Sequence, residues 1–193
     1  DIHTSTAAQV FGLPEEMVTP EMRSAAKAVN FGIIYGIGAF SLSKDINVSV
    51  YEGKKYISDY LHNFPNVEKF MNDTVEKAKR DGYVTTMFGR RRYVPELTAS
   101  NKMMQAAGRR IAMNTPVQGS AADIIKIAMV KVYQRLRDEV PDARLILQVH
   151  DELIVECDVK DADAAAKILS EEMTGACELK VPLTADVNRG DSW

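Results

Sequence analysis

Cysteines and long apolar runs are scarce in this 193-residue sequence, and each scarcity argues against a class of protein. The two cysteines, Cys157 and Cys177, lack the neighbouring ligands of a zinc site and are too few for a disulfide framework. No apolar run approaches the roughly 20 residues that cross a membrane, and the first residues lack signal-peptide character. We therefore expect a cytoplasmic protein with no membrane partner.

The glycines do not form a common nucleotide-binding signature. Gly32, Gly36 and Gly38 match neither the dinucleotide-binding pattern G-x-G-x-x-G nor the P-loop. A Rossmann or Walker-type nucleotide site therefore has little support in this sequence.

The size of the chain allows one substantial core or two closely packed subdomains, because 46% of its residues are hydrophobic. The sequence begins abruptly at Asp1 without a methionine. We expect it to be a piece of a longer protein.

Charge is distributed unevenly along the chain, although the net charge is only -3. Between residues 77 and 110 there are nine Lys or Arg and two acids, whereas from residue 138 onward there are fourteen acids and five bases. A charge run is often just a solvated face. A basic block followed by an acidic one also suits a protein that binds a polyanion in one region and cations in another.

Helical patterns cover much of the chain. Thr19 is a candidate N-cap with Pro20 in the first turn, and we expect helices at 21–35, 51–63, 67–80, 102–113, 120–139 and 161–173. Pro116 is expected to interrupt the fourth of these helices. Ser120 and Asp123 have the spacing of a capping box that opens the fifth.

Strand patterns alternate with these helices. We expect a hairpin of 83–88 with 91–94 around Gly89 and Arg90, a second hairpin of 144–149 with 153–157, and a last strand at 181–187. The fold class is therefore mixed α/β (α+β) with antiparallel sheet.

One face of the helix at 21–35 combines cations with aromatic rings. At 100° per residue, Arg23, Lys27, Asn30, Phe31 and Ile34 share a face, with Tyr35 at its edge. The cations could clamp a triphosphate while the rings pack against a sugar and a base. Spacing alone also allows the rings to be core residues and the cations to be solvated.

Two adjacent carboxylates stand at the turn of the second hairpin, in the sequence His150-Asp151-Glu152. Carboxylates cannot be buried there unpaired, so they either face water or hold a cation. Mg²⁺ prefers such oxygen ligands and completes its shell with water and phosphate. Both interpretations stay open on this evidence.

A third pattern repeats every four residues, at Arg110, Asn114 and Gln118. On one helical face, these groups could read hydrogen-bond acceptors in the minor groove of DNA. An ordinary helix surface explains the pattern nearly as well.

Together the motifs resemble DNA polymerases of family A. The segment Arg23-x-x-x-Lys27-x-x-x-Phe31-Gly32-x-x-Tyr35-Gly36 resembles their fingers-helix motif, and residues 148–152 (Gln-Val-His-Asp-Glu) resemble their palm carboxylate motif. The segments 1–4, 88–91 and 116–119 are also similar to that family, so the resemblance covers essentially the whole chain.

The resemblance implies a role for each candidate residue. His3, Arg23 and Lys27 would bind the triphosphate of a deoxynucleoside triphosphate, Lys27 would also be a candidate proton donor to pyrophosphate, and Phe31 and Tyr35 would flank the sugar and base. Asp151 would be a ligand of Mg²⁺, with two ions in the complete enzyme, and Glu152 would support it. Arg110, Asn114, Gln118 and His150 would contact primer-template DNA.

The resemblance also implies subdomains, with fingers at 1–115, apart from a few first residues that could belong to the palm, and part of the palm at 116–193. The family's first catalytic carboxylate and its thumb would lie before Asp1, so we expect the isolated chain to be an inactive, monomeric piece of a cytoplasmic, nucleoid-associated enzyme. Alternatives are a non-catalytic DNA-binding module and a single-subunit RNA polymerase of the same fold.

Overall fold

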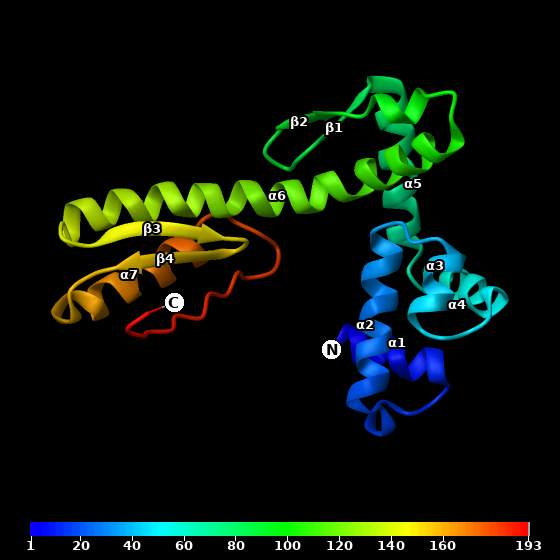
Figure 1. The fold of residues 1–193 in the computed structure, drawn as a ribbon, viewed down its shortest axis with the longest axis horizontal. Helices are drawn as coiled ribbons and strands as arrows, with labels where there is room; N and C mark the ends of the chain where they lie inside the picture. Colours follow the sequence, from blue (N-terminus) through cyan, green and yellow to red (C-terminus); the bar gives the residue numbers. More distant parts are fainter. Residues whose placement is uncertain (193) are drawn as a thin grey trace. The chain divides into compact units, whose positions relative to one another are not determined.

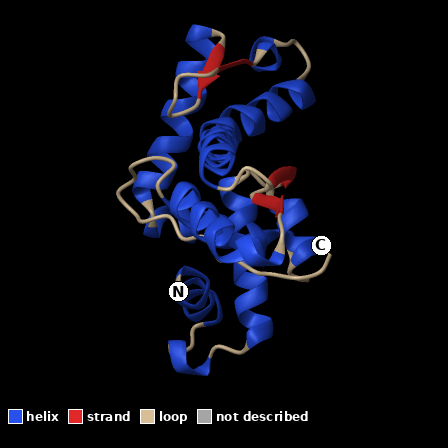
Figure 2. Ribbon diagram, turned by 90° about the vertical axis from the view of Figure 1, so that its left-hand side faces the viewer, coloured by secondary structure: helices blue, strands red, loops and turns tan. Residues whose placement is uncertain are grey.

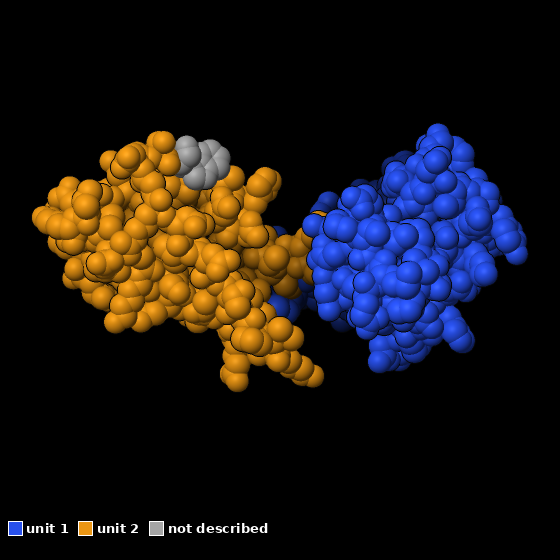
Figure 3. Space-filling model, turned by 90° about the horizontal axis from the view of Figure 1, so that it is seen from below, with its two compact units in different colours: residues 1–116 blue, residues 117–193 orange. Residues whose placement is uncertain are grey.

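The computed structural model describes residues 1–192, which form two compact units, Asp1–Pro116 and a second that begins at Val117 (Figure 3). The elements of the first unit are α1 (Ile2–Phe11), α2 (Pro20–Ile34), α3 (Ala39–Asp45), α4 (Val50–Asn63), α5 (Pro65–Asp81), β1 (Tyr83–Thr85) and β2 (Arg91–Tyr93). Then follow α6 (Lys102–Glu139), β3 (Arg144–Val149), β4 (Glu152–Glu156) and α7 (Ala162–Thr174) (Figure 1). Short 3-10 turns occur at Glu15–Met17, Pro95–Thr98 and Val159–Asp161.

Helices predominate, as Figure 2 shows, and the described strands pair into two small antiparallel sheets. The predicted mixed α+β fold class is confirmed. No helix among residues 1–192 has both the length and the apolar character needed to cross a membrane.

Local signals start the helices of the first unit. The Thr19 hydroxyl accepts a hydrogen bond from the Met22 amide at 3.3 Å, and Pro20 opens α2 as predicted. Ser49 and Glu52 form a reciprocal capping box at α4. The helices α1 and α3, at Ile2–Phe11 and Ala39–Asp45, were not among the predicted helices.

Two apolar clusters stabilise the first unit. One joins α2, α3 and α4 through Val29, Ile33, Leu42 and Tyr60. The other joins α5, the β1–β2 hairpin and the start of α6, and its buried members are Val75, Ala78, Val84, Val94, Leu97, Ala112 and Met113. The hairpin pairs Tyr83 with Tyr93, which confirms the predicted strand pair.

The prediction that Pro116 separates two helices is wrong, because α6 continues without interruption from Lys102 to Glu139. A proline within a helix costs about 3 kcal/mol or more. Buried side chains on both sides of the proline offset this cost, Ala112 in one unit and Ala128 and Val132 in the other. Ser120, 7% exposed, lies inside the helix and does not cap it.

The second unit contains the carboxyl-terminal part of α6, the β3–β4 hairpin and α7. Its core contains Val132, Leu136, Leu153 and Ile168, so α6 and α7 share a cluster with the sheet. Val149 pairs with Glu152, which leaves His150 and Asp151 as a two-residue turn and places Glu152 on β4. The predicted strand at 181–187 is not formed, since the segment has no regular structure, and Pro182 there lacks an amide donor.

Candidate functional site

The outer face of α2 brings together two cations and an aromatic ring. Arg23 and Lys27 are exposed, and Phe31 is 41% exposed. The Lys27 ammonium lies 5.9 Å from the centroid of the Phe31 ring, and that ring lies 5.9 Å from the ring of Tyr35. The arrangement is a surface with a cationic end and an aromatic end, as the helical spacing predicted.

Helix α1 contributes to the same surface. The His3 and Phe31 rings are 5.7 Å apart. The Asp1 carboxylate caps α1 by accepting a hydrogen bond from the His3 amide at 2.9 Å, and it also pairs with the Arg23 guanidinium at 2.6 Å. Asp1 thus connects the amino-terminal end of α1 with Arg23, the first cation of α2.

Asn30 lies inside this arrangement rather than on the exposed face, where the spacing had grouped it with Arg23 and Lys27. It is 2% exposed and turns toward α1. Its Oδ1 accepts a hydrogen bond from the Thr6 hydroxyl at 3.0 Å, and its Nδ2 lies 2.9 Å from Nδ1 of His3. Sequence reasoning missed the roles of Asp1, Thr6 and Asn30, because α1 itself was not predicted.

The surroundings of His3 favour a neutral imidazole. Desolvation lowers the pKa of His3, and the nearby charges of Arg23 and Lys27 lower it further. A neutral imidazole has one N–H donor, and the two cations supply charge-assisted donors beside it. Such a surface is suited to binding an anion with several oxygens.

Gly36 brings the end of α2 close to α6 within the first unit. Its φ of 74° lies in the left-handed region, and a Cβ at this position would lie 3.2 Å from Cγ of Arg110. A side chain here would strain the backbone and crowd Arg110.

The continuity of α6 places Arg110, Asn114 and Gln118 on one helical face, although Pro116 lies between them. Arg110 and Gln118 are exposed, and Asn114 is half-buried. Oδ1 of Asn114 is buried and has no hydrogen-bond partner among the described residues. The exposed donors of this face are therefore those of Arg110 and Gln118, and the Asn114 oxygen is shielded.

The carboxylate turn belongs to the second unit. His150 has a φ of 53°, its carbonyl accepts a hydrogen bond from Nε2 of the Gln148 side chain at 3.0 Å, and Asp151 and Glu152 are exposed. Within residues 1–192, neither carboxylate takes part in an ion pair, and no three His, Cys, Asp or Glu side chains gather closely enough to hold a metal. The turn thus offers exposed oxygen donors from one side only.

The basic block predicted from the sequence includes the β1–β2 hairpin. Arg91, Arg92 and Tyr93 are all exposed on β2. The Arg91 guanidinium lies 4.7 Å from the centroid of Tyr83, and the Tyr83 and Tyr93 rings meet edge to face at 5.8 Å. These contacts hold an arginine and two tyrosines together on one face of the hairpin.

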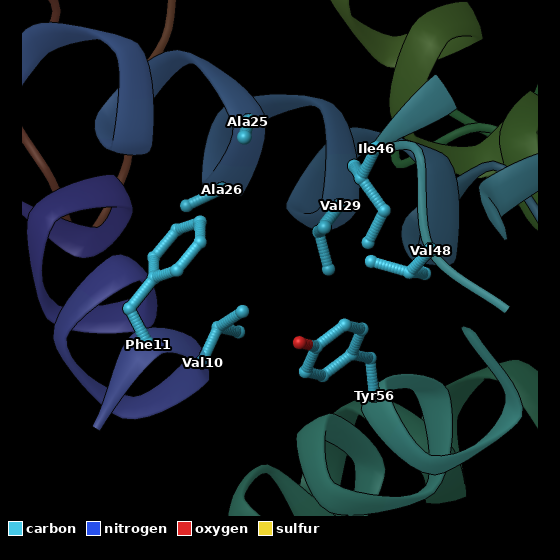
Figure 4. A pocket seen from close by; sticks show the side chains of 8 residues that line it. All are labelled: Val10, Phe11, Ala25, Ala26, Val29, Ile46, Val48 and Tyr56. Atoms are coloured by element: carbon cyan, nitrogen blue, oxygen red, sulfur yellow. The ribbon is translucent and has the colours of Figure 1, made fainter. Parts of the chain in front are cut away.

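The opposite side of α2 is apolar. Ala25, Ala26 and Val29 line a cavity of about 40 Å³, with Val10 and Phe11 of α1 and Tyr56 of α4 around it (Figure 4). The lining of this cavity offers no charged group.

Comparison with known proteins identifies the family. The model for DNA polymerase family A matches residues 1–193. The chain belongs to DNA polymerase family A. Its sequence is 47% identical to DNA polymerase I of Caldicellulosiruptor bescii and 48% identical to DNA polymerase I of Bacillus subtilis, and each match covers 100% of this chain.

The match to a solved structure supports the same family. The POL domain of Pol1 from M. smegmatis, in complex with DNA primer-template and dNTP, superposes with a TM-score of 0.87 and is 41% identical. The match covers 95% of this chain and 32% of that domain chain. This family A chain spans only 23% of the Caldicellulosiruptor polymerase and 22% of the Bacillus polymerase.

Proposed function

We propose that this chain carries the incoming-nucleotide site and one carboxylate turn of a polymerase that adds deoxynucleotides to a primer 3′ end on a DNA template. The observation that carries the proposal is the joint surface of α1 and α2, where His3, Arg23 and Lys27 stand beside Phe31. A polymerase domain with 41% identity that binds primer-template and dNTP supports it.

The triphosphate binds to the cationic end of this surface. Lys27 has no ion-pair partner within residues 1–192, so its ammonium is available to phosphate oxygens without breaking another pair. Arg23 exchanges its pair with Asp1 for a phosphate, and its planar guanidinium can hold two oxygens at once. Lys27 is also the candidate proton donor to the leaving pyrophosphate.

The sugar and base lie against the aromatic end. Phe31 presents an exposed ring one helical turn beyond Lys27, and Tyr35 follows at the end of α2. Because Phe31 has no hydroxyl, it offers only an apolar surface to the sugar. The pair therefore holds the nucleoside by packing and leaves base selection to the template.

Primer and template contact α6 and the turn of the second hairpin. The amides of Asn114 and Gln118 can pair with minor-groove acceptors, which occur at every base pair and thus suit a polymerase that copies any sequence. Arg110 and His150 add contacts near the growing end, and the basic block between residues 77 and 110 attracts the DNA backbone.

Asp151 fits a divalent cation by its chemistry, because it is an exposed carboxylate that forms no ion pair with the residues that the structure describes, and Glu152 beside it supports the same site. We propose Mg²⁺ as the cation. When bound, Mg²⁺ supplies positive charge that stabilises developing charge on phosphoryl oxygens. Since no third ligand gathers there in residues 1–192, the remaining ligands come from water, from substrate phosphate and from other parts of the complete polymerase.

The two compact units correspond in this proposal to the fingers, 1–115, and to a part of the palm, 116–193. A primer-extension assay with the complete polymerase tests the function. We expect extension with deoxynucleotides that follows the template, poor use of ribonucleotides, and no extension by the isolated 193-residue chain.

Two other outcomes would each replace the proposal. Preferential use of ribonucleotides would indicate an RNA polymerase of the same fold. DNA binding by the complete protein without any extension would indicate a non-catalytic DNA-binding module.

A further inference from the structure

Asn30 is a buried amide that connects the two helices of the nucleotide surface. It lies on α2 between Lys27 and Phe31 in sequence order, yet it is 2% exposed while they are exposed. Both of its hydrogen-bond partners, His3 and Thr6, belong to α1. Thr6 is itself 4% exposed, so the Thr6–Asn30 hydrogen bond is shielded from water, while His3 is half-buried.

The hydrogen bonds of Asn30 determine which nitrogen of His3 carries a proton. The Thr6 hydroxyl donates to Oδ1 of Asn30 at 3.0 Å, which leaves the amide nitrogen to face the imidazole. An amide nitrogen can only donate, so Nδ1 of His3, at 2.9 Å, must accept. A neutral imidazole that accepts at Nδ1 carries its proton on Nε2.

We propose that Asn30 is a positioning residue that fixes His3 in the Nε2–H tautomer and orients its ring, so that Nε2 donates a hydrogen bond to the triphosphate of the incoming nucleotide. Thr6 supports Asn30 by holding the amide in the required orientation. This inference rests on the proposed function, because it presupposes that His3 binds the triphosphate.

The charged groups around His3 favour the neutral form. Arg23 and Lys27 face it from α2, and the Asp1 carboxylate is already paired with Arg23 at 2.6 Å. The Phe31 ring packs beside the imidazole at 5.7 Å and limits its rotation. Once the ring is neutral, only the nitrogen that carries the proton can donate to an anion, so the tautomer decides whether His3 helps to bind phosphate.

The test is a double-mutant cycle in the complete polymerase. Single-turnover incorporation gives the maximal rate constant of incorporation and the apparent Kd of the dNTP. Asn30→Leu removes the amide while keeping a side chain of similar size. We expect it to weaken dNTP affinity about tenfold, the scale of a hydrogen bond to a charged group. The maximal rate constant of incorporation should change less than about threefold. In a His3→Ala background, Asn30→Leu should weaken affinity no further.

Two more variants separate positioning from folding. Thr6→Val, which keeps the shape of the side chain, should weaken dNTP affinity in the same direction by a smaller factor, and it decides the question if Asn30→Leu does not fold. Ser43→Ala is the matched control, because Ser43 is also a buried polar residue of the first unit, 4% exposed, but its hydroxyl donates to the Phe40 carbonyl of its own helix. It should leave dNTP affinity unchanged.

Each failure has its own signature. If His3→Ala weakens dNTP binding but both Asn30→Leu and Thr6→Val do not, the positioning role is wrong. Additive effects of Asn30→Leu and His3→Ala would also overturn it, because Asn30 would then act independently of His3. If His3→Ala itself leaves dNTP affinity unchanged, the phosphate-binding assignment of His3 in the proposed function fails instead.

Discussion

Replacing Lys27 by alanine removes the one cation of the nucleotide surface that is not already paired within residues 1–192. A hydrogen bond to a charged group contributes about 1.5–3 kcal/mol. Loss of one such bond therefore predicts a decrease in kcat/KM of roughly 10- to 150-fold. The decrease should lie at the upper end if Lys27 also donates a proton to pyrophosphate, because that contribution exists only in the transition state.

The fold should tolerate Lys27→Ala. The side chain is exposed, and alanine favours helix, so the free energy of unfolding should change by less than about 0.5 kcal/mol. Lys54→Ala is a matched control, since Lys54 is another exposed lysine on a helix of the same unit. It should leave incorporation unchanged.

The assay is single-nucleotide incorporation by the complete polymerase bound to primer-template, with DNA affinity measured separately. We expect nearly unchanged DNA affinity and slow incorporation by the bound complex. A large loss of DNA affinity with normal incorporation by the bound complex would refute the placement of Lys27 at the triphosphate.

Three further predictions concern the sugar contact, the pH dependence of stability and the second core. Phe31→Tyr should make the complete polymerase accept dideoxynucleotides much more readily, since a hydroxyl there can replace the interaction of the missing 3′-OH, and an unchanged ratio of dideoxy to deoxy incorporation would argue against Phe31 at the sugar. The pKa of His3 is lowered by desolvation and by Arg23 and Lys27, so the unfolded state takes up its proton first as pH falls below 6.5, the ordinary pKa of a histidine. The contribution of His3 to the free energy of unfolding should therefore be fully present above pH 6.5 and decrease below it. Denaturant unfolding above and below pH 6.5 should show a smaller decrease for His3→Gln than for the unchanged protein. Leu136→Ala should cost about 2–5 kcal/mol in thermal or denaturant unfolding, because Leu136 is 2% exposed in the α6–α7 core, and a cost under about 1 kcal/mol would contradict that packing.

The parts of the fold that follow from local chemistry were predictable from the sequence. Thr19 and Pro20 determine where α2 begins, and the strand patterns gave both hairpins to within a few residues. The face that joins Arg23, Lys27 and Phe31 follows from helical spacing alone.

The parts that depend on packing were not predictable in this way. Pro116 breaks a helix by its local chemistry, but buried neighbours in both units keep α6 continuous. Asn30 has the helical position of a surface residue, and only its contacts with α1 make it a buried link to His3. A strand at 181–187 would need a partner strand, and spacing within the segment carries no information about one.

The most direct test of the central claim is the Mg²⁺-dependent incorporation rate of Asp151→Asn in the complete polymerase, compared with Asp158→Asn. Asp158 is an exposed acid of the same unit, and its Oδ2 lies 3.5 Å from the ammonium of Lys160. We predict that Asp151→Asn abolishes incorporation while primer-template and dNTP still bind, and that Asp158→Asn retains normal incorporation. Normal template-directed incorporation by Asp151→Asn would contradict the assignment of this turn to the catalytic metal site.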